Sequence, residues 1–192
     1  MKQTLLLAAC FLFILSTFAQ DEAPKTKGFD RNKVFIGSSV NLGLSGNFFN
    51  LGLNPEIGYS LTQWLDFGTV VNLNYFSQNN SSFKENSFNY GIGGFLRIWP
   101  LNFVHLQIQP EYNWISSSRV FNNSGPTQKY NSSAGSLLAG IGYGSRQIGS
   151  RFSHFTIMID LLQELNSPYR DQFGGQLPVF RAGFGVYLKP KN

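Results

Sequence analysis

The chain has 192 residues, of which 42% are hydrophobic, 16% aromatic and only 13% charged; ordinary soluble domains carry about 25% charged residues. This apolar content excludes intrinsic disorder, and a single cysteine excludes a disulfide scaffold. The formal net charge of +5 comes from scattered basic residues, so we expect no nucleic-acid partner.

The start of the chain has the pattern of a secretory signal peptide. A basic residue at position 2 precedes an apolar run that ends near Ile14, and Thr17-Phe18-Ala19 offers a small-residue cleavage site. The run is shorter than the roughly 20 residues that a membrane-spanning helix needs. We therefore predict a signal peptide over 1–19, a polar periplasmic tether over 20–32 and a barrel domain over 33–189.

From residue 33 onward, apolar and polar side chains alternate with a period of two, which is typical of β-strands. Most of these segments are about as long as the 9–11 residues that a tilted strand needs to cross a bilayer, and all exceed the usual globular strand of about 5–6 residues. The predicted strands cover 33–44, 49–60, 65–76, 88–98, 104–115, 134–146, 153–164 and 178–188.

The volume of the side chains on the two faces predicts which face points inward. One face is rich in Gly, Asn, Gln and ionisable residues, and the other in Phe, Tyr, Leu and Ile. Because an eight-stranded barrel has an interior just wide enough for side chains, a ring of large aromatic residues would overfill it. We predict an all-β fold: an eight-stranded antiparallel up-and-down transmembrane β-barrel with its apolar face toward lipid.

Apart from the first connection, Ser45 to Phe48, which is short, the connections alternate in length and suggest an orientation. Short turns are expected near 61–64, 99–103 and 147–152, and longer polar loops near 77–87, 116–133 and 165–177; outer-membrane barrels have short periplasmic turns and longer extracellular loops. Aromatic residues near strand ends predict two interfacial girdles: Trp64, Trp99 and Phe103 on the periplasmic side, and Tyr75, Phe88 and Trp114 on the outer side. Six loop residues are candidates either for contact with a partner or glycan or for packing back on the barrel: Phe83, Arg119, Phe121, Tyr130, Tyr169 and Arg170.

Ionisable residues of the inward face must be paired or solvated. Neighbouring strands suggest that Asp66 pairs with Arg97, and Asp160 with Arg181. We expect a charge network that plugs the lumen, with an ion or proton path as the alternative. Its members are Glu56, Asp66, Arg97, His105, Glu111, Arg146, Asp160 and Arg181.

The run Leu53-Asn54-Pro55-Glu56-Ile57-Gly58-Tyr59-Ser60-Leu61, followed by Leu65-Asp66-Phe67-Gly68, resembles the second and third strands of the small outer-membrane β-barrel family of Bacteroidetes-type bacteria, within the porin-like superfamily. The resemblance implies an eight-stranded barrel in the outer membrane of a Gram-negative cell envelope.

The expected function is structural or surface-interactive, through the extracellular loops. The expected partners are outer-membrane lipid and an extracellular or envelope protein, with no enzyme activity, cofactor or metal. His105 and His154 are the candidates for a lipid-modifying enzyme, but the sequence has neither a Gly-x-Ser-x-Gly elbow nor a HExxH motif. The pattern is also compatible with a small diffusion pore and with a soluble lipocalin-like binder.

Overall fold

The computed structural model describes residues 28–45, 48–121, 126–170 and 175–188, including a short 3-10 helix, η1 (Arg31–Lys33). The predicted signal peptide, most of the predicted tether and residue 189 lie outside the described residues. The strands that follow are β1 (Val34–Ser45), β2 (Phe48–Ser60), β3 (Leu65–Asn79), β4 (Phe83–Leu101), β5 (Val104–Phe121), β6 (Gln128–Ser145), β7 (Arg151–Asp160) and β8 (Val179–Tyr187).

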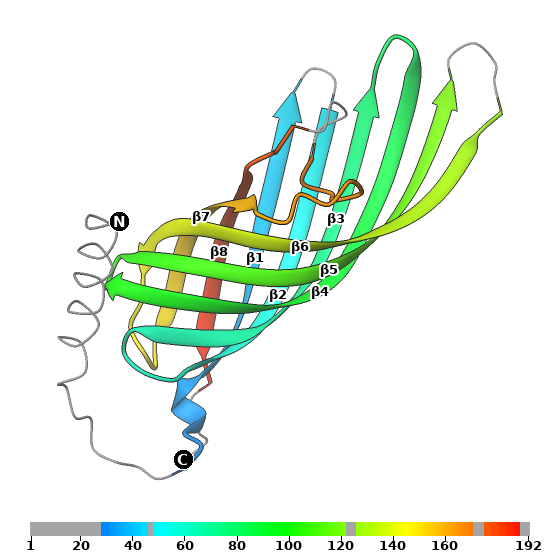
Figure 1. The fold of residues 1–192 in the computed structure, drawn as a ribbon. Coiled ribbons are helices and arrows are strands. Elements are labelled where there is room, and N and C mark those ends of the chain that lie inside the picture. Colours follow the sequence, from blue (N-terminus) through cyan, green and yellow to red (C-terminus); the bar gives the residue numbers. More distant parts are fainter. Residues whose placement is uncertain (1–27, 46–47, 122–125, 171–174, 189–192) are drawn as a thin grey trace, which may run out of the picture. The chain divides into compact units, whose positions relative to one another are not determined.

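Each strand pairs antiparallel with the next one in the chain, and β8 pairs with β1 to close the barrel (Figure 1). Closure leaves no sheet edge along the paired part of the wall, which is how up-and-down barrels satisfy their backbone groups. The predicted eight-stranded antiparallel up-and-down barrel is therefore confirmed.

The two faces of the wall differ in the way the alternation predicts. Along β7 and β8 every second side chain is buried and the others are exposed. Large apolar side chains stand on the outside, such as Ile57 (52% exposed), Ile92 (55%) and Ile141 (55%), while most buried side chains in the lumen are polar or charged. This is the opposite of a water-soluble barrel, which hides its apolar face.

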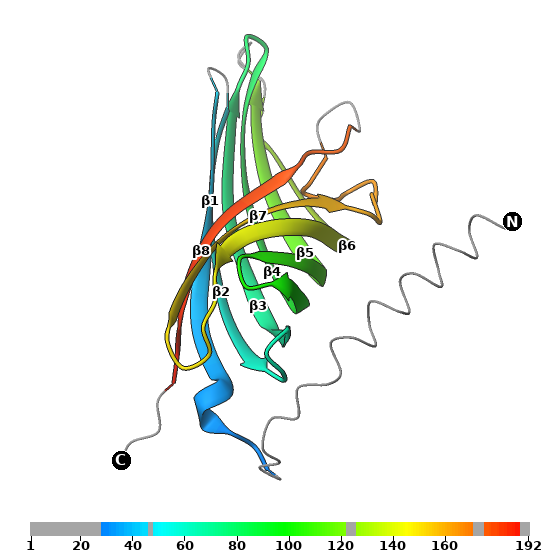
Figure 2. The ribbon, with the colours of Figure 1, turned by 90° about the vertical axis from the view of Figure 1, so that its left-hand side faces the viewer.

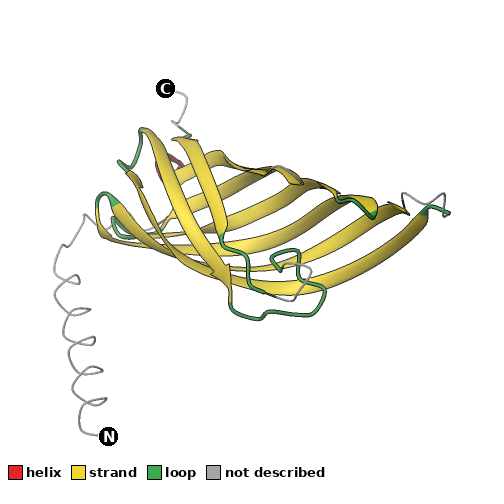
Figure 3. Ribbon diagram, turned by 90° about the horizontal axis from the view of Figure 1, so that it is seen from above, coloured by secondary structure: helices red, strands yellow, loops and turns green. Residues whose placement is uncertain are grey.

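Strand lengths depart from the prediction. β4, β5 and β6 have 19, 18 and 18 residues and extend through most of the loops predicted at 77–87 and 116–133, whereas β7 ends at Asp160 instead of 164. Seen from the side, the hairpins of β3 to β6 continue well past β7 and β8 (Figure 2), and from above the strands form a curved wall (Figure 3). The part of the barrel farthest from the short turns is therefore a curved sheet of long strands.

The alternation inverts in these extensions, which explains why the pattern concealed them. Beyond Tyr75 and Trp114, polar residues occupy the outward positions except at Val120, and the inward positions gain aromatic residues. The outward set includes Ser77, Lys84, Asn86, Ser116, Ser118, Lys129 and Asn131, and the inward set Phe83, Phe121 and Tyr130. A sheet that leaves lipid for water needs a polar outer face, so the inversion marks the upper limit of the lipid-facing band.

The lumen also contains aromatic rings, contrary to the expectation that they would overfill it. One inner cluster consists of Phe35, Val70, Phe95, Phe152 and Tyr187. Phe95 lies directly across the ladder from Gly68, and a Cβ on Gly68 would lie 2.6 Å from the Phe95 ring. Phe35 faces Gly58, and Phe152 faces Gly185, in the same way. Glycine on the neighbouring strand therefore provides the space that each ring occupies.

Candidate functional site

All eight members of the predicted charge network point into the lumen, where their side chains are mostly buried. Arg97 forms two hydrogen bonds with the Glu56 carboxylate, at 3.0 and 2.6 Å, and a third with Gln107 at 2.7 Å. The predicted pairing of Arg97 with Asp66 is wrong, although these two residues are opposite each other in the ladder. The arginine side chain instead spans the lumen to β2, because Asp66 is bonded elsewhere.

Asp66 is the centre of a second group at the end of the barrel where the short turns lie. Its carboxylate accepts hydrogen bonds from Arg146 at 2.5 and 2.9 Å, from Ser60 at 2.6 Å and from the Trp99 indole at 2.8 Å. Trp99 is therefore a lumen residue, and its predicted place in the girdle is wrong. It follows Arg97 by two positions in β4, so the strand period directs both side chains inward.

Glu111 organises the other end of the lumen. It accepts hydrogen bonds from Gln109 at 2.7 Å and from the Tyr169 hydroxyl at 2.5 Å, and Arg181 lies 3.8 Å away. The remaining donors to this carboxylate are Asn72 and Asn113. Charge pairing therefore links β5 to β8 across the barrel.

Asp160 does not pair with Arg181, so this predicted pair is also wrong. Thr156 is the residue opposite Arg181, which places Asp160 four residues further along β7. Asp160 instead accepts hydrogen bonds from Ser167 at 2.7 Å and from the backbone N–H of Leu137 at 3.0 Å. It fixes the start of the loop that joins β7 to β8.

That loop, the described residues of 161–178, turns inward at Tyr169. The Tyr169 ring packs against Leu138, Met158 and Val179, and its hydroxyl bonds Glu111. Burial, and after it the neighbouring Glu111 charge, raise the pKa of Tyr169 well above its ordinary value. The hydroxyl therefore stays protonated and donates to the carboxylate at every physiological pH.

His105 and His154 lie inside the barrel near Trp99. The ring centroids of His105 and Trp99 are 4.5 Å apart, and those of the two histidines 5.5 Å. The Nε2 atom of His105 is 3.0 Å from the Thr156 hydroxyl. This is a hydrogen bond to a threonine, whereas a nucleophilic triad needs a carboxylate to orient the imidazole. In the described part of the chain, no three His, Cys, Asp or Glu side chains are grouped so as to hold a metal ion.

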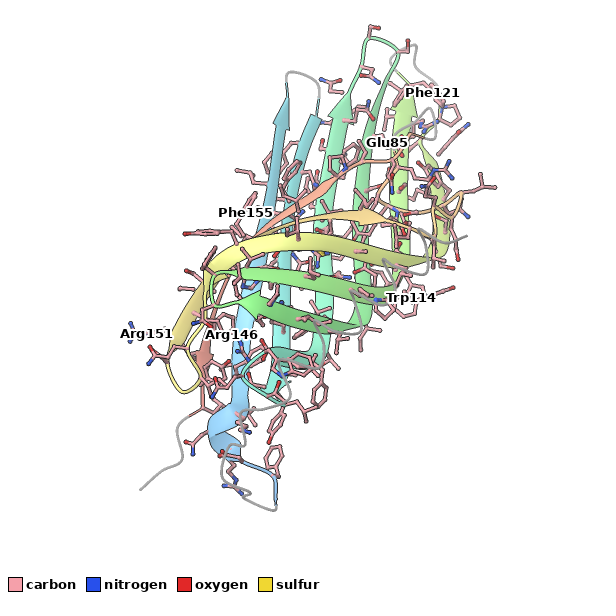
Figure 4. The ribbon with its side chains drawn as sticks, turned by 60° about the vertical axis from the view of Figure 1, so that its left-hand side comes forward. Glu85, Trp114, Phe121, Arg146, Arg151 and Phe155 are labelled. Atoms are coloured by element: carbon pink, nitrogen blue, oxygen red, sulfur yellow. The ribbon has the colours of Figure 1, made fainter. Side chains whose placement is uncertain are left out.

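Aromatic side chains of the outer girdle stand on the exterior of β3 to β5. Tyr75 and Phe88 are cross-strand neighbours, and the rings of Tyr90 and Trp114 stack at 5.7 Å. Figure 4 labels Trp114 on one side of the barrel and Phe155 on another. The prediction missed the stacking residue Tyr90, which the period of two places on the same face as Phe88.

At the opposite end, Phe103 is exposed and its ring lies 6.0 Å from that of Tyr143. Trp64 is half-buried in the turn before β3, and its backbone oxygen accepts the N–H of Trp99 at 2.7 Å. Phe103 and Tyr143 thus form an exposed aromatic pair at the short-turn end.

Four of the predicted loop residues lie in strands. Phe83 begins β4, Arg119 and Phe121 end β5, and Tyr130 belongs to β6, because the strand extensions replace the loops. Of the remaining two, Tyr169 inserts into the lumen, and Arg170 donates a hydrogen bond to the backbone oxygen of Gln163 at 2.8 Å.

The extensions contain a compact polar and aromatic group, here called the rim cluster: Phe83, Glu85, Arg119 and Tyr130. Arg119 forms an ion pair with Glu85 at 2.7 Å, and its guanidinium lies 4.7 Å from the Phe83 ring centroid. Tyr130 hydrogen-bonds the same Glu85 carboxylate. These contacts tie β4, β5 and β6 together beyond the lipid-facing band.

An apolar exterior, a polar filled lumen and strands long enough to cross a bilayer define a transmembrane β-barrel. The exposed aliphatic exterior argues against the soluble lipocalin-like binder. Within the described residues, no helix is long and apolar enough to cross a membrane.

Several solved structures are similar to this chain at low sequence identity. The attachment invasion locus protein Ail of Yersinia pestis is 9% identical, with a TM-score of 0.44 over 79% of this chain and 93% of Ail. A major outer membrane protein of Thermus thermophilus is 12% identical, with a TM-score of 0.49 over 80% and 98%. Neisserial surface protein A is 12% identical, with a TM-score of 0.47 over 81% and 96%.

No family model matches the chain, and no curated protein matches it. The resemblance to the Bacteroidetes-type family therefore stays a prediction. Likeness to solved structures at this level of identity assigns no function to this chain.

Proposed function

We propose that the protein is an integral outer-membrane barrel that does not conduct, and that it acts through the part of its sheet that extends outside the membrane. Outer-membrane barrels keep both termini and their short turns on the periplasmic side. In this proposed orientation, the rim cluster and the β7–β8 loop lie on the cell surface.

The observation that carries the proposal is the filling of the lumen at successive levels. The aromatic cluster around Phe35 lies near the short-turn end, and the Glu56–Arg97 ion pair lies above it. Near the surface end, Tyr169 of the β7–β8 loop closes on Glu111. Because the buried charges already bond one another, they cannot offset the free energy that an ion would lose by shedding its water on entering the lumen.

A conductance measurement tests the closed lumen. Purified barrel inserted into a planar lipid bilayer should give no discrete conductance steps under voltage, in conditions where a porin inserted as a positive control conducts. Steady single-channel steps from this protein would overturn the plugged barrel and favour the diffusion pore.

Surface display tests the orientation. An epitope tag inserted after Ser81, in the exposed β3–β4 turn, should be detected on intact cells. The matched control is the same tag after Gly149, in the turn between β6 and β7, which should be detected only after lysis. The reverse result would contradict the proposed surface role.

A further inference from the structure

Among the described residues, the half of β6 farther from the short turns has a strand on only one side. β5 pairs with β6 along almost its whole length, from Gln128 to Tyr143. β7 pairs with it only from Ser145 back to Leu138. In the described part of the chain, the segment Gln128–Leu137 therefore presents a strand edge, which Figure 1 shows rising beyond β7.

The direction of the backbone groups on this edge follows from the contacts at its base. The N–H of Leu137 bonds Asp160, and the N–H of Gly135 bonds Glu164, both at 3.0 Å. Both acceptors lie on the side away from β5. Leu137 is also opposite Pro110. Proline has no N–H, so these two residues cannot exchange the two hydrogen bonds of a bonded antiparallel pair, and the N–H of Leu137 is free to point away from β5.

The register of β6 with β5 has no break over this segment. Because antiparallel strands alternate the direction of their hydrogen-bonding groups with a period of two, Lys129, Asn131 and Ser133 also direct their N–H and C=O groups away from β5. Lys129 and Asn131 are exposed, and Ser133 is half-exposed.

The chain's own carboxylates show which kind of group binds to this edge. At Leu137 and Gly135 the side chains of Asp160 and Glu164 take the places that the carbonyl oxygens of a neighbouring strand would fill, and the N–H of Leu161 bonds the oxygen of Leu137 at 2.8 Å. Beyond these positions the same row of donors and acceptors continues with no strand beside it among the described residues.

We propose that this β6 edge binds an extended segment of another protein by main-chain pairing, adding one strand to the sheet. The proposal rests on the surface role proposed above, because the edge is accessible to a partner only outside the membrane. An exposed edge strand is a template for such pairing.

The side chains that flank the edge indicate the composition of the segment. Lys129 points to the outer face, and Tyr130, a member of the rim cluster, points to the concave face. Directly opposed cross-strand pairs favour unlike charges and aromatic contacts. The segment is therefore an alternating one, with acidic residues on the side of Lys129 and apolar or aromatic residues on the side of Tyr130.

The probe is a labelled, end-capped synthetic peptide, Thr-Val-Glu-Phe-Glu-Val-Thr, which reads the same in both directions and so suits parallel or antiparallel pairing. Its binding to the purified full-length barrel in detergent is followed by fluorescence anisotropy. We expect saturable binding that weakens about tenfold with Asn131→Pro, which removes one edge N–H and with it a hydrogen bond. Asn131→Ala keeps that N–H and should bind as the original chain does.

A second measurement does not depend on the fold of a variant. Peptides N-methylated at the Glu positions and at the Val and Phe positions are compared on the unaltered barrel. A strand pairs through alternate residues only, so methylation of one set should abolish binding and methylation of the other should leave most of it.

If the probe does not bind at a concentration of about 1 mM, which would detect a dissociation constant as weak as about 1 mM, the proposal is overturned. Equal loss of binding from both sets of methylated peptides would also overturn it. A dimer in detergent that Asn131→Pro dissociates would assign the edge to a second copy of the chain instead. A negative result in the peptide experiments would contradict only the proposed binding at the β6 edge and not the non-conducting barrel. Conductance steps would contradict the non-conducting barrel and would leave the proposed binding at the β6 edge untouched.

Discussion

Several rings of the lumen lie opposite residues that have no side chain. Phe95 lies across from Gly68, and His105 lies across from Gly142. A Cβ on Gly142 would come within 2.1 Å of the His105 ring. The glycines of the polar face thus decide which aromatic side chains can be inside.

Gly68→Ala should destabilise the barrel by about 1–3 kcal/mol, the usual cost of overpacking, since its Cβ would meet the oxygen of Ile57 at 2.3 Å and Phe95 at 2.6 Å. Denaturant unfolding in detergent measures the change. The control is Gly94→Ala on the neighbouring strand, whose Cβ would meet only an ordinary contact at 3.5 Å and which should change stability by less than about 0.5 kcal/mol. Equal losses from the two substitutions would contradict the pairing.

Glu56→Ala should cost about 3–5 kcal/mol of unfolding free energy, because it leaves the buried Arg97 charge unpaired. Adding Arg97→Met should restore much of the loss, and a double-mutant cycle by denaturant unfolding shows whether it does. Glu85→Ala breaks a similar pair with the part-exposed Arg119 and should cost no more than about 1 kcal/mol. Simple additivity at Glu56 and Arg97 would rule out the coupling.

The β7–β8 loop is a connecting element whose described residues reach into the lumen. Asp160 holds its start, and Gln176 donates to the backbone oxygen of Asp160 at 2.5 Å near its end. Between them, Tyr169 reaches Glu111. The sequence predicted a polar loop here and left open whether Tyr169 packs back on the barrel, because contacts between a loop and a distant strand have no period.

Tyr169→Phe should loosen the loop while keeping its ring in the apolar cluster. A hydrogen bond to a charged group contributes about 1.5–3 kcal/mol, so opening should become roughly 10- to 100-fold more frequent. The rate of trypsin cleavage after Arg170 reports this opening. Leu165→Ala, at a side chain that is 90% exposed, is the control and should leave the rate unchanged. Unaltered cleavage of Tyr169→Phe would mean that the hydroxyl does not hold the loop.

At the scale of the whole molecule, the lipid-facing band ends where the alternation inverts. Ile108 and Ser118 both occupy outward positions of β5, Ile108 below Trp114 and Ser118 above it. The same strand and the same face therefore meet lipid at one height and water at another.

Ile108→Lys should reduce the free energy of folding into lipid vesicles by about 2–4 kcal/mol, the cost of a cation near the bilayer midplane. Ser118→Lys should reduce it by less than about 1 kcal/mol, since positions near or beyond the interface tolerate charge. Denaturant titration of vesicle-folded protein compares the two. A cost at Ser118 as large as that at Ile108 would place the band higher than proposed.

The sequence by itself determined the number of strands, their order, and which face of each strand points to the lumen in the lipid-facing band. Those features follow from a period of two and from the cost of exposing apolar or burying polar groups, which act on each strand locally. It also predicted that the eight residues of the charge network face inward, because each follows the same alternation.

Only the tertiary structure decided the partners of those charges. Arg97 faces Asp66 in the ladder yet bonds Glu56, since a long side chain can cross a narrow lumen and bond a strand that is not its neighbour. The strand extensions, the inward Trp99 and the exposed β6 edge were likewise visible only in the closed barrel. Each depends on where strands of unequal length end relative to one another, and no local pattern in the chain encodes that relation.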